Sequence, residues 1–141
     1  MPEANLKPRL RMTSLYFVAN TFNYLVAGTG NRSELEIGYF TKYGDGGVDM
    51  LPLGNLFKDQ VRTLARQLDI PTPIIEKAPS AGLWLGQTDE NEMGFSYADL
   101  ELYLRKNSKE LPVELTSRIE HLMRSSAHKR ALPPRPPEFD E

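Results

Sequence analysis

The sequence contains no cysteine and only two histidines, His121 and His128, among its 141 residues. The absence of cysteine excludes disulfide bonds, zinc–cysteine sites and a cysteine nucleophile. Two histidines are too few for a histidine-rich metal site. No apolar run approaches the roughly 20 residues that a membrane-spanning helix needs, and residues 1–12 show no apolar stretch typical of a signal peptide. We therefore expect a cytoplasmic protein with no membrane partner.

The sequence also lacks an excess of either sign of charge. Seventeen Lys and Arg residues against nineteen Asp and Glu residues give a formal net charge of −2. This balance argues against nucleic acid as a partner, because non-specific binding to it requires a clearly basic domain. Apolar residues make up 40% of the chain, which is enough for a core, and the length fits one domain.

The apolar pattern alternates between helical and extended segments. Stripes with helical spacing predict helices at residues 6–22, 33–39, 55–68 (with Asn55 as the cap), 96–104 and from 112 onward. A short apolar run at residues 24–28 predicts a buried parallel strand, and residues 50–53 predict a second extended piece. The order indicates an α/β fold with few parallel strands and about five helices. Two strands need more cover than this sequence offers, so we expect it to be part of a larger unit.

Two segments lack a regular pattern. Residues 76–94 contain glycines, a proline and several polar residues and predict a long irregular loop, which we expect to be mobile without ligand. Residues 131–141 hold four prolines in eleven residues and end with acidic side chains, which is typical of an extended or disordered tail. We therefore divide the chain into a domain at residues 1–132 and a tail at residues 133–141.

The turn after the predicted strand at residues 24–28 is the first candidate site. In open α/β sheets ligands bind beyond the carboxyl ends of the strands, and the small residues from Gly28 to Asn31 would let a nucleotide approach the backbone. The Thr29 hydroxyl is a hydrogen-bonding group there, and Glu34 in the next helix is a candidate ligand for Mg²⁺ between phosphates. The alternative is an ordinary turn followed by an acid that the helix dipole favours.

A glycine-rich loop carries the second candidate site. Lys42, Asp45 and Asp49 lie among three glycines, which let a loop fold tightly on a ligand. An aspartate beside a lysine suits binding of ammonium, acceptance of a proton, or contact with a ribose hydroxyl. The alternative is a solvated turn, because Asp-Gly is a common turn dipeptide.

Other basic side chains stand at positions that favour anions. Lys58 lies in the first turn of a helix, where it opposes the dipole, and His128-Lys129-Arg130 closes the last helix, where a cation is favoured. A surface lysine and a capping role are the respective alternatives. Arg9 and Arg11 are two residues apart on one helix, so they point to different faces, and one of them is free to reach a ligand.

Taken together, these segments resemble the carboxyl-terminal half of ammonia-dependent NAD synthetase, from about residue 7 to residue 133. The stretch Thr41-Lys42-Tyr43-Gly44-Asp45-Gly46-Gly47 is the most specific of them. The others follow in the order of the family, at residues 9–12, 25–31, 33–34, 38–49, 52–58, 77–81, 86–90 and 128–130. The resemblance implies a Rossmann-like, three-layer fold of the adenine-nucleotide alpha-hydrolase type.

The family makes NAD from deamido-NAD, ATP and ammonia, with Mg²⁺ as cofactor, so the resemblance implies a role for each matching residue. For ATP, it implies contacts from Thr29, Lys58 and Ser80. Glu34 would hold Mg²⁺, and Asp45, with Lys58, would be catalytic, Asp45 capturing or deprotonating ammonia. The residues implied for deamido-NAD are Arg9, Lys42, Asp49, His128 and Lys129. The family also implies a homodimer with the deamido-NAD site at the subunit interface.

The sequence departs from the family at three places. Ser80 stands where many members have threonine, which keeps the hydroxyl, and Gly82 stands where many have aspartate. The family's Ser-Gly-Gly-X-Asp-Ser segment, which cradles pyrophosphate with backbone amides, does not occur. We therefore expect the isolated chain not to synthesise NAD without a separate amino-terminal half. The alternatives are a non-catalytic dinucleotide-binding or dimerisation module and an inert remnant.

Overall fold

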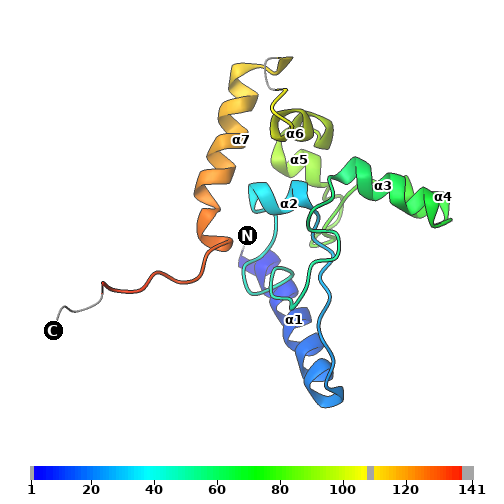
Figure 1. The fold of residues 1–141 in the computed structure, drawn as a ribbon, viewed down its shortest axis with the longest axis vertical. Coiled ribbons are helices and arrows are strands. Elements are labelled where there is room, and N and C mark those ends of the chain that lie inside the picture. Colours follow the sequence, from blue (N-terminus) through cyan, green and yellow to red (C-terminus); the bar gives the residue numbers. More distant parts are fainter. Residues whose placement is uncertain (1, 108–109, 138–141) are drawn as a thin grey trace.

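The computed structural model describes residues 2–107 and 110–137 as helices joined by long irregular segments (Figure 1). In these ranges the α-helices are α1 (Pro2–Phe22), α2 (Arg32–Ile37), α3 (Lys58–Gln67), α4 (Thr72–Ile75), α5 (Asp89–Met93), α6 (Tyr97–Leu104) and α7 (Val113–Ser125), and η2 (Ala127–Lys129) is a 3₁₀ turn. The five predicted helices are confirmed as α1, α2, α3, α6 and α7. The expected number of about five is too low, because α4 and α5 are short additional helices.

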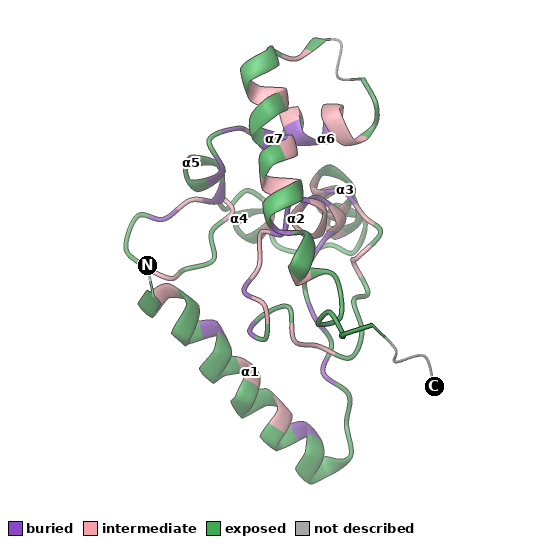
Figure 2. Ribbon diagram, turned by 90° about the vertical axis from the view of Figure 1, so that its left-hand side faces the viewer, coloured by how far each residue is buried: buried purple, intermediate pink, exposed green. Residues whose placement is uncertain are grey.

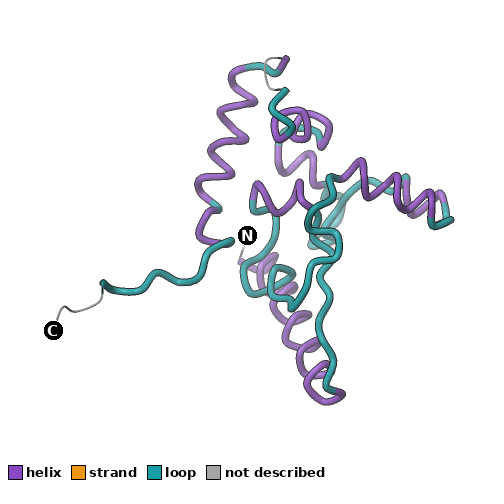
Figure 3. The backbone as a smooth tube through the Cα atoms, viewed as in Figure 1, coloured by secondary structure: helices purple, strands orange, loops and turns teal. Residues whose placement is uncertain are grey.

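No strand forms in the described ranges, as Figure 3 shows. Ala27 and Met50 form an isolated parallel β-bridge, next to which Gly28 N donates to Met50 O at 2.8 Å. The buried strand predicted at residues 24–28 is therefore wrong in its extent. Val26 is buried, but Tyr24 and Leu25 are 68% and 72% exposed. A parallel strand needs neighbours on its edges and cover on both faces, and these two segments have only each other.

The hydrophobic core lies where α2, α5, α6 and α7 meet. It contains six buried residues from three separate stretches of the sequence, namely Ile37, Met93, Phe95, Tyr97, Leu100 and Ile119. In Figure 2 the buried colour gathers around α2, α6 and α7, whereas most of α1 is exposed. A capping box starts α6, because Asp99 N donates to Ser96 Oγ at 3.1 Å and Ser96 N donates to Asp99 Oδ2 at 3.2 Å.

Helix α3 begins two residues later than the predicted cap implies. Its N-cap is Phe57 rather than Asn55, and two side chains from elsewhere accept from its first backbone amides. Lys58 N donates to Ser33 Oγ and Asp59 N donates to Glu101 Oε1, both at 3.3 Å. The start of α3, and with it the position of Lys58, is therefore fixed by α2 and α6.

The long loop predicted at residues 76–94 is irregular from residue 76 to residue 88, and α5 replaces its last part. Residues 131–137 of the predicted tail are exposed and without regular structure, and residues 138–141 lie outside the described residues. The division at residues 132 and 133 stays a prediction. In the described part of the chain, no helix is long and apolar enough to cross a membrane.

Candidate functional site

One cavity of about 750 Å³ opens between α1, the start of α3 and the loop that precedes α5. Its wall also includes residues 26–29 and parts of the glycine-rich segment at residues 38–48. Six of the predicted site residues line it, namely Thr29, Glu34, Asp45, Lys58, Ser80 and Lys129. The structure therefore brings together side chains that are up to 100 residues apart in sequence.

Glu34 and Lys58 form an ion pair at one end of this cavity. Lys58 Nζ lies 3.1 Å from Glu34 Oε1, and both side chains are about four-fifths buried. The second Glu34 oxygen accepts from Asn31 N at 3.0 Å, which completes a capping box at the start of α2. A largely buried cation beside a carboxylate is an arrangement that suits phosphate and a divalent cation.

A pair of tyrosines and a pair of carboxylates extend this end of the cavity. Tyr97 Oη lies 2.9 Å from Asp89 Oδ2 and 3.2 Å from Glu34 Oε1. Tyr39 Oη lies 3.2 Å from Asp89 Oδ1 and 2.7 Å from Glu92 Oε2. Burial raises the pKa of Asp89 above its ordinary value, and hydrogen bonds from the two tyrosines and the charge of Lys58 oppose that shift.

Lys129 and Asp45 stand at the other side of the cavity wall. Lys129 Nζ donates to Gly38 O at 2.7 Å and to Phe40 O at 2.8 Å, so it ties η2 to the segment after α2. Burial lowers the pKa of Lys129, and the charge of Asp45 opposes this shift. Asp45 Oδ1 accepts from Thr41 N at 2.9 Å.

Four predicted site residues do not line the cavity. Three of them, Arg9, Lys42 and His128, form a continuous group that we call the basic row. Arg9 Nε donates to the carbonyl of Lys42 at 3.4 Å, and Lys42 Nζ donates to the carbonyl of His128. The basic row therefore lies on the surface of a single chain rather than inside its cavity.

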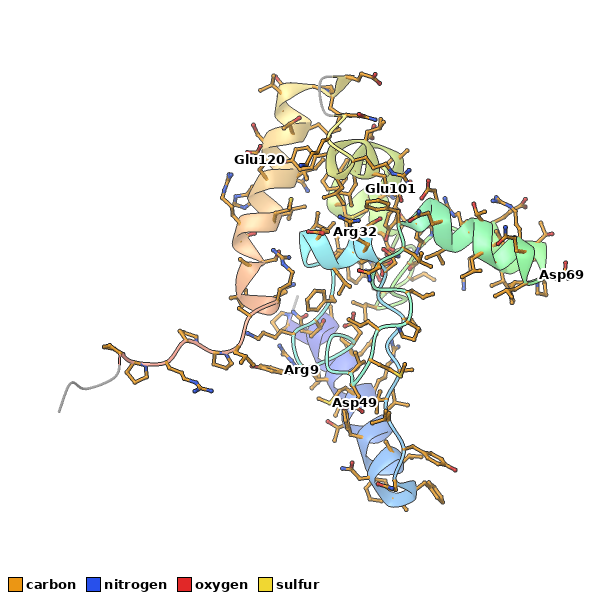
Figure 4. All side chains as sticks on the ribbon, in the orientation of Figure 1. Arg9, Arg32, Asp49, Asp69, Glu101 and Glu120 are labelled. Carbon is orange, nitrogen blue, oxygen red and sulfur yellow. The ribbon has the colours of Figure 1, made fainter. Side chains whose placement is uncertain are left out.

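Asp49 is the fourth predicted residue outside the cavity, and it makes structural contacts. Its Oδ2 accepts from Val26 N at 2.7 Å, and its Oδ1 accepts from Tyr16 Oη at 2.9 Å. Figure 4 labels Asp49 and Arg9 beside α1. Asp49 thus joins α1 to the segment that carries the isolated β-bridge.

Comparisons with known proteins show which family the chain belongs to. The sequence model of the NAD synthase family matches residues 1–133. This chain belongs to the NAD synthase family. Its relatives include the NH₃-dependent NAD⁺ synthetases of Carboxydothermus hydrogenoformans, 61% identical over 92% of this chain, and Archaeoglobus fulgidus, 57% identical over 94% of it. The chain spans about half the length of these curated relatives, 53% and 54% respectively.

Solved structures show the same relationship for this family member. An NMN synthetase from Francisella tularensis matches with a TM-score of 0.89 and 47% identity, covering 94% of this chain and 55% of the other. An NH₃-dependent NAD synthetase from Campylobacter jejuni matches with a TM-score of 0.73 and 31% identity, covering 94% and 54%. The α/β class of these neighbours agrees with the parallel bridge, but the Rossmann-like three-layer detail is absent from the described residues.

Sequence reasoning missed several side chains in and beside the cavity of this family member. Tyr97 lies beside the cavity wall, where its hydroxyl contacts Glu34 and Asp89, and its place in the apolar pattern of α6 indicated no functional role. Asp89 and Tyr39, which line the cavity, lay in stretches that carry the family resemblance without a role. Arg11 is the arginine of α1 that lines the cavity, whereas Arg9 contacts Lys42. The helical spacing had shown that the two arginines differ in direction but not which one reaches the cavity.

Proposed function

We propose that this chain supplies the carboxyl-terminal part of an ammonia-dependent NAD synthetase, an ATP-dependent amide ligase. The observation that carries the proposal is the convergence of Thr29, Glu34, Lys58 and Ser80 on one cavity. The family resemblance assigns these residues to ATP and Mg²⁺ from the sequence alone, without regard to their contacts or to the cavity that they line.

The proposed reaction has two steps. A carboxylate oxygen of deamido-NAD attacks the α-phosphorus of ATP, and the bond to pyrophosphate breaks, which leaves an acyl adenylate. Ammonia then attacks the carbonyl carbon, AMP leaves, and the nitrogen loses a proton to give the amide. In this scheme the Lys58 ammonium stabilises negative charge on the phosphates, and Asp45 binds the ammonium ion or takes its proton.

Glu34 fits the role of one magnesium ligand among several. No group of three His, Cys, Asp or Glu side chains that could hold a metal ion occurs in the described ranges. Mg²⁺ is ordinarily held by one or two carboxylates together with substrate phosphates, so a single carboxylate beside a phosphate-binding lysine is sufficient here. The ion would neutralise charge on the phosphates.

We further propose that deamido-NAD binds across a homodimer interface. Helix α1 exposes six large apolar side chains, Leu6, Leu10, Leu15, Phe17, Val18 and Phe22. Packing of α1 against its mate would cover Leu6, Leu10 and Phe17, which share one side of the helix by their spacing. It would also place the basic row, which lies outside the cavity of one chain, at the edge of a shared site.

A glutamine substitution at Glu34 tests the ATP and Mg²⁺ assignment. In the unchanged protein, calorimetry is expected to show that Mg²⁺ tightens the binding of ATP. Glu34→Gln removes the anionic oxygen and is expected to abolish that enhancement. Glu36→Gln is the matched control, because Glu36 lies on the same helix and pairs with Arg32 at the surface. Loss of the enhancement in both variants, or in neither, would contradict the assignment.

A second candidate substrate follows from the similarity to the NMN synthetase of Francisella tularensis. Nicotinate mononucleotide carries the same carboxylate as deamido-NAD and lacks the adenylate half. Parallel titrations with the two compounds separate these functions. Tighter binding of nicotinate mononucleotide would favour mononucleotide amidation over the proposed dinucleotide activity.

A further inference from the structure

Tyr97 contacts three functional groups of the cavity at once. It is 3% exposed and stands at the first position of α6. Its hydroxyl lies 2.9 Å from Asp89 Oδ2 and 3.2 Å from Glu34 Oε1, and Lys58 Nζ lies 5.0 Å from its ring centroid. The hydroxyl therefore contacts Asp89 and Glu34, and the ring face contacts Lys58.

The tyrosine has one proton for two carboxylates. The hydroxyl is the donor in both contacts, because carboxylate oxygens accept. Glu34 Oε1 already has Lys58 Nζ at 3.1 Å as a cationic donor. The Tyr97 hydroxyl therefore donates its hydrogen bond mainly to Asp89, because the oxygen–oxygen distance is shorter there.

Asp89 in turn holds the loop that carries Ser80. The backbone N of Asp89 donates to Pro79 O at 2.9 Å, directly before Ser80. The remaining oxygen of Asp89, Oδ1, lies 3.2 Å from Tyr39 Oη. Asp89 is 5% exposed, so its contacts replace the water that a carboxylate would otherwise bind. A side chain that donates to Asp89, as Tyr97 does, therefore also fixes the position of Ser80 relative to Lys58.

We propose that Tyr97 is a positioning residue, which joins the Glu34–Lys58 pair to the loop of Ser80 through its hydroxyl and its ring. Its role in ATP binding rests on the proposed function, whereas its hold on the loop does not. Tyr97 touches no substrate atom in this account. It sets the distance between the groups on α2 and α3 and the group on the loop, which come from three separate parts of the chain.

Tyr97→Phe tests this proposal, because it removes the hydroxyl and keeps the ring. The matched control is Tyr103→Phe on the same helix, which removes a hydroxyl that lies 3.3 Å from Glu120 Oε1, outside the cavity. Amide hydrogen exchange without ligand is expected to quicken about tenfold at residues 79–89 in Tyr97→Phe, which is the effect of one lost buried hydrogen bond. The exchange rate of the amides in α7 is expected to change in Tyr97→Phe by no more than it does in Tyr103→Phe.

ATP binding gives the second readout. Calorimetry is expected to show about tenfold weaker binding to Tyr97→Phe and an unchanged affinity for Tyr103→Phe. If Tyr97→Phe does not fold, Asp89→Asn weakens the same hydrogen bond by changing its acceptor. This variant is expected to quicken amide exchange at the same residues, 79–89.

The two readouts separate the two proposals. If the unchanged protein binds no ATP, the proposed function fails, and exchange at residues 79–89 still decides the role of Tyr97. Unchanged exchange at these residues in Tyr97→Phe would overturn that role. Faster exchange spread evenly over α2, α6 and α7 would also overturn it, because it would show a contribution to the core alone.

Discussion

Replacing Lys58 with methionine is expected to weaken ATP binding by about 100-fold. Hydrogen bonds to charged groups contribute up to about 3 kcal/mol, which corresponds to a factor of about 100 in the dissociation constant. Lys58 is a largely buried cation in the cavity wall, and its nitrogen already faces a carboxylate, so its position requires no large rearrangement when phosphate binds. Methionine keeps the length of the side chain and much of its packing on Tyr97. Calorimetric titration with ATP and Mg²⁺ measures the change.

Two further variants show whether that loss belongs to the charge at this position. Lys106→Met removes a charge from an exposed lysine that does not line the cavity, and its affinity for ATP is expected to remain unchanged. Lys58→Met leaves the Glu34 carboxylate without its cation, which lowers the stability of the fold. The double variant Glu34→Gln/Lys58→Met is expected to recover that stability and not the affinity. An affinity within threefold of the unchanged protein in Lys58→Met would remove Lys58 from the ATP site.

Replacing Gly38 with alanine is expected to lower the free energy of unfolding by about 3 kcal/mol or more. Gly38 ends α2 in the left-handed region, with φ of +67°, and a Cβ there would lie 2.2 Å from Ser126 Cβ. Because Ser126 stands directly before η2, the clash would push η2 away from α2. Lys129, which donates to Gly38 O, would lose its place in the cavity wall. Urea unfolding measures the loss of stability.

Gly82→Ala is the control for the backbone part of this effect. Gly82 has a similar φ of +62°, but an added Cβ would meet nothing within 4 Å. Its substitution is expected to lower the free energy of unfolding by only about 1 kcal/mol, the cost of placing alanine in the left-handed region. Equal losses in the two variants would show that contact between α2 and η2 does not determine the stability.

Local signals in the sequence predicted helix starts well where the cap comes from the helix itself. The capping box of Ser96 and Asp99 fixed the start of α6 because both partners lie within three residues. Asn55 was the wrong cap for α3 because Ser33 and Glu101, which accept from its first amides, are far away in sequence. The strand at residues 24–28 was overestimated for a related reason, since a strand is stabilised by neighbours that the pattern of one segment does not reveal.

The candidate site shows the same division between local and distant information. Glu34 and Lys58 were predicted one by one from their helix positions and the resemblance, and folding brings them to 3.1 Å. Tyr97 escaped prediction because its place in the apolar pattern of α6 describes a core residue equally well. Only the packing of α6 against α2 and the loop shows that its hydroxyl faces two carboxylates.

Titration of the unchanged chain with deamido-NAD by calorimetry, with its mass in solution recorded alongside, tests the central claim most directly. The account predicts saturable binding by a dimer, because the basic row lies outside the cavity of one chain and α1 exposes large apolar side chains. Absence of binding by a folded chain, with hydrogen exchange showing α2, α6 and α7 protected, would contradict the claim that this cavity and its rim form the substrate site of an NAD synthetase.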